Sequence, residues 1–450
     1  MGNDIESVEK RVFAWIDEHK DDIIKFCMDY IRYKSPTGKE LEVQRDFIKP
    51  FFEKAMKFDE IDYFSVAPDV ERPNVSGIWK GVGGGRNLLL SGHSDVVDVG
   101  PEALKRWTKD PWNPVIEDGK IYGRGANDMK GGNTAMIWAT KALMDLGIQL
   151  KGDVLVSCVI GEELNQEKWG VIPATKRLQN KGINIPFCIV PEPTNNEIHI
   201  LSAGTFDFSI TIYGKEVHTS FKNFTQYPQR YGIPVGSEVG VDAIAIMIDL
   251  IQRLYKLEHQ WNLRPGDEIF GGGGYPIPKD MQGVGANSIN CTLLEGGTYI
   301  AAVPGYARLR GHVFYSPRFD PEKLMAEIKE VVNSLATTYD WLKEHPPEVK
   351  FKELFDWPYY EVPRDHPGVQ TLVKVYEKVT GQTAIISGFK AVDDAAYIQR
   401  ECGIDAISFG PGNLSMGTHG PDEYLPIDQL IVATKVLAAM IIEWCGLAKG

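Results

Sequence analysis

The chain has 450 residues, of which 43% are hydrophobic and 24% charged, a length that suggests two domains and supplies a sizeable core. The formal net charge of −13, with no basic run of five or more residues, argues against a nucleic-acid-binding surface. No apolar run approaches the roughly 20 residues that span a bilayer, and the N-terminal segment lacks the apolar core of a signal peptide. The six cysteines are scattered without a Cys-x-x-Cys pair, so we expect a reduced, cytoplasmic protein with no membrane partner.

The first half of the chain alternates between predicted helices and strands. Helices are expected over Ile5–Tyr33 and Leu41–Met56, and the alternation then continues to about Leu201. This order is typical of a mostly parallel sheet with helices on both faces. Three short apolar runs bounded by turn residues, beginning at Leu88, Val154 and Phe187, are predicted to be its buried strands.

The pattern changes at Ser202. Residues Thr205–Tyr213 alternate between polar and apolar, as a half-exposed antiparallel strand does. The elements predicted next are a helix over Val239–His259, strands at Asn287–Leu294 and Ala307–Tyr315, and a helix over Pro321–Asp340. We therefore expect an α/β fold in which residues 1–201 and 319–450 form a catalytic domain. Residues 202–318 are predicted to form an inserted, smaller α+β domain of ferredoxin-like type, which serves as a lid and a dimerisation surface.

After Pro346 the sequence regains its α/β character. The predicted elements are a helix over Gly368–Thr380, a strand at Ile385–Ser387, a helix near Asp394–Glu401, a strand at Ala406–Phe409 and a last helix over Ile427–Cys445.

The stretch 88–97 reads LLLSGHSDVV and places His93 and Asp95 at the end of a predicted buried strand. Residues two apart on an extended chain point the same way. A carboxylate beside an imidazole commonly fixes the orientation of a metal-binding histidine. A capped strand end with a surface histidine would give the same pattern, so the choice depends on other ligands.

Further carboxylates and one histidine follow strands or turns at intervals. They are Asp128 in GRGANDMKGG, Glu162 and Glu163 after the second buried strand, Glu192 after the third, and His419 in GTHGP. Ligands of open α/β sheets bind at the carboxyl ends of the strands, so we expect these side chains to converge. One catalytic zinc ion takes about three protein ligands, and this set exceeds that number. The count favours two divalent ions that share one carboxylate; zinc is the leading candidate, and cobalt and manganese stay open.

With these motifs the chain resembles the two-zinc amidohydrolases that include acetylornithine deacetylase, succinyl-diaminopimelate desuccinylase, aminoacylase-1 and carboxypeptidase G. The resemblance runs over nearly the whole length. The motifs that carry it are GHSDVV, GRGANDMKGG, GEE, EPT, GKEVHTS, FGPG and THGPDEYLP, in this order.

The resemblance implies a role for each of these side chains. His93 and Glu192 would bind one metal ion, and Glu163 and His419 the other. Asp128 would bridge the two, with a cis peptide bond to Met129. Asp95 would orient His93, and Glu162 would act as general base and then general acid.

The resemblance also implies that His218, in GKEVHTS, stabilises the oxyanion and reaches the site from the partner subunit of a homodimer. A surface histidine in a hairpin is the alternative. The implied reaction is hydrolysis of the amide C–N bond of a small N-acylated amine or amino acid. The alternatives are a dipeptidase or carboxypeptidase of the same family, and a non-catalytic metal-binding module on this scaffold.

The chain departs from its relatives in the inserted domain. Ala301 stands where the family often carries Asn, and His312 and Phe314 replace Asp and Arg. An arginine fork pairs with a carboxylate and a phenyl ring does not, so an α-carboxylate on the substrate is in doubt. Other candidates to hold one are Arg308, Arg310, Lys390 and Asn287.

Two segments of the inserted domain have no assigned role. The aromatic-rich insertion Phe221–Glu238 is interpreted either as a wall of the substrate pocket or as a dimer contact, and the stretch 271–278 as a loop. The identities of the acyl group and of the amine stay open.

Overall fold

The computed structural model describes residues 5–221, 239–264 and 287–448. Within these residues the chain forms two compact units, one of residues up to Ser202 and from Tyr360 onward, the other from Ala203 to Tyr359. The predicted boundary at residue 318 is wrong. The helix α9 (Pro321–Ser334) contacts the helix α8 (Ala243–Asn262), and the strand β14 (Glu348–Trp357) pairs with β9 (Gly204–Tyr213), so both belong to the second unit.

The first unit is built on an eight-stranded sheet with the order β1-β2-β6-β3-β7-β16-β8-β15. Its four central strands, β6, β3, β7 and β16, run parallel, and β2 and β8 flank them in antiparallel pairing. The predicted, mostly parallel sheet is confirmed. The strands are β1 (Glu60–Ser65), β2 (Pro73–Trp79), β6 (Val154–Val159), β3 (Leu88–His93), β7 (Phe187–Val190), β16 (Asp405–Ser408), β8 (Ile198–Ser202) and β15 (Ile386–Phe389).

Two largely buried helices line this sheet. The helices α5 (Gly131–Asp145) and α12 (Ile427–Cys445) contact each other and the strand β3, and most of their residues are buried. Both therefore belong to the core of the first unit. Helices α6 (Val171–Asn180) and α11 (Asp394–Cys402) contact each other and other strands of the sheet.

Among its described residues, the first unit also contains five further α-helices and a second, smaller sheet. The predicted first helix is two helices, α1 (Ile5–Glu18) and α2 (Lys20–Arg32). The others are α3 (Lys49–Lys54), α4 (Pro101–Leu104), α10 (Pro367–Thr380), and a small sheet of β17 (Tyr424–Pro426), β5 (Lys120–Tyr122) and β4 (Val115–Glu117). Among the described residues, no helix combines the length and apolar character needed to cross a bilayer.

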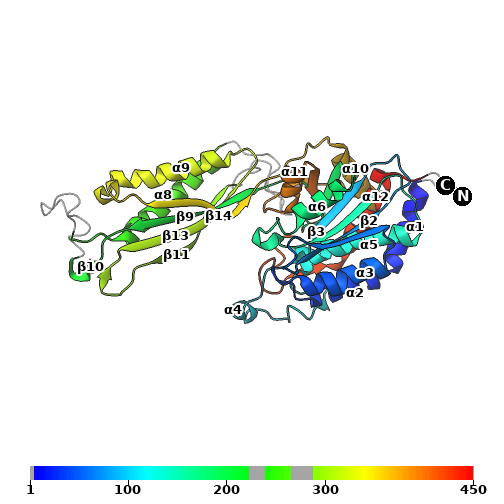
Figure 1. Cartoon of the computed structure of the whole chain (residues 1–450), viewed down its shortest axis with the longest axis horizontal. Helices are drawn as coiled ribbons and strands as arrows, with labels where there is room; N and C mark the ends of the chain where they lie inside the picture. Colours follow the sequence, from blue (N-terminus) through cyan, green and yellow to red (C-terminus); the bar gives the residue numbers. More distant parts are fainter. Residues whose placement is uncertain (1–4, 222–238, 265–286, 449–450) are drawn as a thin grey trace. The chain divides into compact units, whose positions relative to one another are not determined.

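The second unit is an antiparallel sheet with the order β11-β13-β9-β14, backed by the helices α8 and α9 (Figure 1). Its strands include β11 (Ser288–Gly296) and β13 (Tyr306–Tyr315); the short strands β10 (Val217–His218) and β12 (Ala302–Val303) form a separate pair. Apolar residues of α8, α9 and the sheet form one core around the fully buried Trp261. The helix α8 begins where Asp242 accepts a hydrogen bond from the Ala245 main chain, as an N-cap does.

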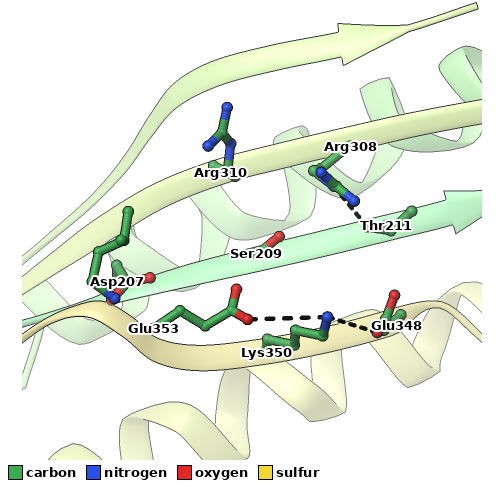
Figure 2. A pocket seen from close by; sticks show the side chains of 9 residues that line it. Asp207, Ser209, Thr211, Arg308, Arg310, Glu348, Lys350 and Glu353 are labelled. Carbon is green, nitrogen blue, oxygen red and sulfur yellow. Dashed lines mark hydrogen bonds and ion pairs between the residues drawn. The ribbon is translucent and has the colours of Figure 1, made fainter.

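A groove of about 330 Å³ crosses the polar face of this sheet (Figure 2). The predicted β9 strand is confirmed, but it is more buried than expected. Ser209 and Thr211 are only 8% and 2% exposed because long side chains from β13 and β14 flank them. These include Arg308, which donates to Thr211 Oγ1 over 3.3 Å, and Lys350, which lies 3.0 Å from Glu348.

Candidate metal centre

The ends of three adjacent parallel strands bring the predicted metal ligands to one edge of the sheet. In the register of β3 and β6, His93 lies opposite Val159, so the turn that carries Glu162 and Glu163 follows directly beside it. On the other side of β3, the strand β7 ends at Val190, two residues before Glu192. Because parallel strands share the direction of their carboxyl ends, three separate segments deliver their side chains to one point.

The position of His93 depends on close packing around β3. A side chain at Gly92 would place its Cβ 2.2 Å from Asn133 Oδ1, so only glycine fits there. Asn133 in turn donates a hydrogen bond to the His93 carbonyl over 2.6 Å. The ring nitrogen Nδ1 of His93 lies 2.9 Å from the Asp95 main-chain oxygen, which leaves Nε2 to face the site.

The contacts of Asp95 differ from the prediction that its carboxylate orients the His93 imidazole. Its Oδ1 is 3.7 Å from His93 Nδ1, beyond hydrogen-bonding distance. The carboxylate instead accepts main-chain hydrogen bonds from Gly161 (2.8 Å) and Glu163 (3.2 Å), and one from the Thr37 hydroxyl (2.7 Å). Gly161 has a left-handed φ of 87°, which turns the chain so that these N–H groups meet Asp95. Asp95 therefore orients His93 through its carbonyl and holds the Glu162–Glu163 turn through its carboxylate.

The first group of candidate side chains surrounds His93 Nε2. This atom lies 3.2 Å from Asp128 Oδ1, 3.6 Å from Glu192 Oε1 and 3.7 Å from Glu162 Oε2. His93, Glu162 and Glu192 are all buried, and their ligand atoms lie within 4.8 Å of one another.

The second group surrounds His419, which is exposed. Its Nε2 lies 3.3 Å from Asp128 Oδ2 and 2.9 Å from Glu163 Oε2. Asp128 thus presents one carboxylate oxygen to each histidine, the arrangement expected of a bridging ligand. The peptide bond between Asp128 and Met129 is cis, as the resemblance predicts.

The chemistry of this cluster fits divalent metal ions. His93 Nε2 and Glu192 Oε1 are buried, and neither has a hydrogen-bond partner among the described residues. Buried polar atoms are nearly always satisfied, so these two atoms indicate a missing partner. Burial raises the pKa of Glu162 and Glu192. A bound cation would offset the cost of grouping four carboxylates with two imidazoles in this pocket.

Sequence reasoning missed two buried carboxylates beside the cluster. Asp393 caps the helix α11 by accepting a hydrogen bond from the Ala395 main chain over 2.8 Å. Neither carboxylate oxygen of Asp394 has a hydrogen-bond partner among the described residues, and its charge contributes, after burial, to the raised pKa of Glu162. Both aspartates follow the strand β15, so the strand-turn-carboxylate pattern that identified Glu192 could have found them.

The remaining predicted residues lie in other parts of the molecule. His218 is an exposed residue of β10 in the second unit, where its Nδ1 lies 2.9 Å from Ser220 Oγ. Arg308 and Arg310 line the groove of the second unit (Figure 2). The residues His312 and Phe314 face each other edge to face, with ring centroids 5.0 Å apart. Of the insertion 221–238 and the loop 271–278, all but Phe221 lie outside the described residues.

Comparison with known proteins gives consistent matches over the length of the chain. The sequence profile of "Peptidase family M20/M25/M40" matches residues 89–443. The chain is 31% identical to N-formyl-4-amino-5-aminomethyl-2-methylpyrimidine deformylase of Bacillus subtilis (strain 168), with 100% of both chains covered. It is 30% identical to the protein of the same name from Halalkalibacterium halodurans, with 98% of this chain and 99% of that protein covered. Among solved structures, the dipeptidase Dug1p of Saccharomyces cerevisiae superposes with a TM-score of 0.74 at 16% identity, covering 96% of this chain and 98% of that one.

Proposed function

Because the chain belongs to peptidase family M20/M25/M40 and is a metal-dependent hydrolase of amide C–N bonds, we propose that it removes formate from an N-formylated amine on an aminopyrimidine-like ring. The observation that supports this substrate class is the sequence similarity to two deformylases over essentially the whole of each chain. The substrate named for these relatives includes an N-formyl group and a pyrimidine, and no carboxyl group. A substrate without a carboxylate agrees with Phe314, which stands where related enzymes carry an arginine.

We propose that the cluster holds two zinc ions, with the ligand sets that the resemblance implies. His93 and Glu192 would hold one ion, and Glu163 and His419 would hold the other. Asp128 would hold both ions, since it lies beside both histidines. When bound, such ions supply an acidified water molecule and polarise the carbonyl oxygen of the substrate.

We propose that the remaining carboxylate of the cluster, Glu162, is the general base. It is buried, and its Oε2 lies 3.7 Å from His93 Nε2, inside the same pocket. Glu162 takes a proton from the attacking water as the water oxygen bonds to the formyl carbon. It then delivers that proton to the amide nitrogen as the C–N bond breaks, which releases formate and the free amine.

The variant Glu162→Gln tests the role of this side chain. Glu162→Gln keeps the shape of the side chain but cannot accept the proton, and we expect kcat to fall by a factor of about 10²–10⁴. Zinc content should stay near two ions per chain, because Glu162 is not assigned as a ligand. A variant with near-normal kcat would overturn the assignment of the base.

A substrate screen tests the proposed specificity. N-formyl aminomethylpyrimidines are compared with N-formyl and N-acetyl amino acids and with dipeptides, each at several concentrations with zinc added. We expect the highest kcat/KM for the carboxylate-free formamides. Preferred hydrolysis of dipeptides or of N-acyl amino acids would contradict the proposed substrate.

We further propose that the protein is a homodimer through the second unit. Ile248 and Tyr255 on the helix α8 are 50% and 48% exposed, and Leu293 and Leu294 on the strand β11 are each 55% exposed. The strand β11 lies at the edge of the described four-stranded sheet. An exposed apolar edge commonly marks an interface, and a twofold dimer would cover it with the same surface of a second copy.

A mixing experiment tests whether His218 acts on the partner's site. Protomers carrying Glu162→Ala and protomers carrying His218→Ala are each expected to be nearly inactive. If the dimer is twofold and His218 acts in trans, co-expression in equal amounts restores about a quarter of the activity, since half of the dimers then have one complete site. If His218 acts within its own chain, or if the protein is monomeric, co-expression restores nothing.

A further inference from the structure

A buried carboxylate outside the ligand set joins the two loops that carry Asp128 and His419. Glu423 is 0% exposed and lies four residues after His419. Its Oε1 accepts three main-chain hydrogen bonds, from Gly125 (3.0 Å), Asn127 (2.9 Å) and Asp128 (3.1 Å). Glu423 Oε1, on the loop of His419, therefore fixes the backbone of the other loop from Gly125 to Asp128.

Two further side chains join the same loops. Arg124 donates to Glu423 Oε2 over 2.5 Å and to the Gly420 carbonyl over 3.1 Å. Asn127 donates to Thr418 Oγ1 over 2.5 Å and to the Asn413 carbonyl over 2.9 Å. The Asn127 side-chain oxygen also accepts a hydrogen bond from the Asn413 main chain over 3.0 Å.

These contacts involve the residues that directly precede Asp128 and His419. Asn127 precedes Asp128 and Thr418 precedes His419, and the two ligand atoms Asp128 Oδ2 and His419 Nε2 are 3.3 Å apart. We propose that Glu423 is a positioning residue that sets the spacing of Asp128 and His419, and so the affinity of the metal site that these two residues share. The inference rests on the proposed function, because it needs a metal ion at that site.

The negative charge of Glu423 is what this position requires. Three N–H groups converge on Oε1, and a carboxylate oxygen accepts such bonds more strongly than an amide oxygen does. The charge also compensates the Arg124 guanidinium, which is 2% exposed. Removing one member of a buried ion pair leaves the other uncompensated and can prevent folding. A test of positioning must therefore remove the pair together.

The main test compares Arg124→Met/Glu423→Gln with the wild-type protein and with Asp422→Asn. Asp422 is a matched control because it lies on the same loop but accepts its hydrogen bonds from Thr108 and Lys109, away from the ligands. Each protein is stripped of metal and titrated with zinc against a competing chelator, and its thermal midpoint is measured without metal. A second variant, Glu423→Asp, keeps the charge but withdraws the oxygens from the three N–H groups.

We expect the wild type and Asp422→Asn each to bind two zinc ions. At each of the two sites, the variant should have the same affinity as the wild type. In the double variant the zinc ion at the site of Asp128 and His419 should bind about 10–100-fold less tightly, the usual effect of removing a group that holds a ligand. Glu423→Asp should give a smaller loss of affinity, and excess zinc should restore part of the activity of both variants.

The possible outcomes test the positioning role of Glu423 separately from the existence of the metal centre. If Glu423→Asp and the double variant bind both zinc ions as the wild type does, Glu423 does not position the ligands, whatever its effect on the thermal midpoint. If the wild type binds no zinc, the proposed metal centre itself is wrong, and that result does not depend on Glu423. If the double variant does not fold, the zinc affinity of Glu423→Asp alone decides the question.

Discussion

The dual role of Asp95 gives the sharpest prediction, since its carbonyl and its carboxylate act on different ligands. In Asp95→Asn the main-chain bond to His93 Nδ1 remains, because it does not involve the side chain. The amide nitrogen, however, cannot accept a hydrogen bond. If it replaces Oδ1, the N–H groups of Gly161 and Glu162 lose their acceptor, and if it replaces Oδ2, the N–H of Glu163 does. The damage is thus predicted to fall on the turn that carries Glu162 and to spare His93.

The size of the effect follows from these contacts. A hydrogen bond to a charged group contributes about 1.5–3 kcal/mol, and at least one such bond is lost. If the whole of that energy is lost as misplacement of Glu162, kcat falls by a factor of about 10–150, since 1.36 kcal/mol corresponds to a factor of ten. Stability against denaturant should fall by a similar free energy.

The assay measures kcat and KM for the formamide at saturating zinc, together with zinc affinity by chelator competition. We expect a lower kcat, little change in KM, and weaker binding only of the zinc ion held by Glu163. Thr37→Val, which removes only the hydroxyl bond to Asp95, serves as the control and should cost about 1 kcal/mol of stability. The reasoning is refuted if Asp95→Asn weakens the site of His93 and leaves kcat at saturating zinc unchanged, because the carboxylate would then act on the histidine.

Three further predictions address the metal centre, the substrate and the second unit. Chelation should lower the thermal midpoint and added zinc should restore it, because a ligand that binds only the folded state stabilises it; an unchanged midpoint in differential scanning fluorimetry would count against the centre. Phe314→Arg should raise kcat/KM for N-formyl amino acids relative to carboxylate-free formamides by about tenfold or more; no change in that ratio would mean that this position does not contact the substrate. Leu250→Ala, at a site 0% exposed in the core of the second unit, should cost about 2–5 kcal/mol in urea denaturation, and a loss below 1 kcal/mol would contradict the assigned packing.

Much of the candidate site could be predicted from the sequence because short-range patterns determine it. His93, Glu162 and Glu192 each lie at or just after the end of a buried apolar strand. The parallel pairing of these three strands brings their carboxyl ends together. The second unit was harder to delimit, since β14 is separated from its partner β9 by more than 130 residues. No local pattern reveals such a pairing, and the boundary at residue 318 was wrong for that reason.

Hydrogen-bond partners could not be predicted even where the residues were identified. The sequence placed Asp95 beside His93 correctly, but the spacing does not distinguish a carbonyl contact from a carboxylate contact. The answer depends on the turn at Gly161, which comes from another strand. Glu423 was overlooked for the same reason, since its partners lie nearly 300 residues earlier in the chain.

Taken together, Asp95 and Glu423 show how a site with four clustered carboxylates can be held in place. Each is a buried carboxylate that accepts main-chain N–H groups from a loop that carries ligands, one at Gly161–Glu163 and the other at Gly125–Asp128. Main-chain donors are fixed by the backbone and offset the negative charge of both carboxylates, and Glu423 is also paired with the Arg124 guanidinium. All of these groups belong to the first unit, whereas the departures from related sequences at Ala301, His312 and Phe314 lie in the second.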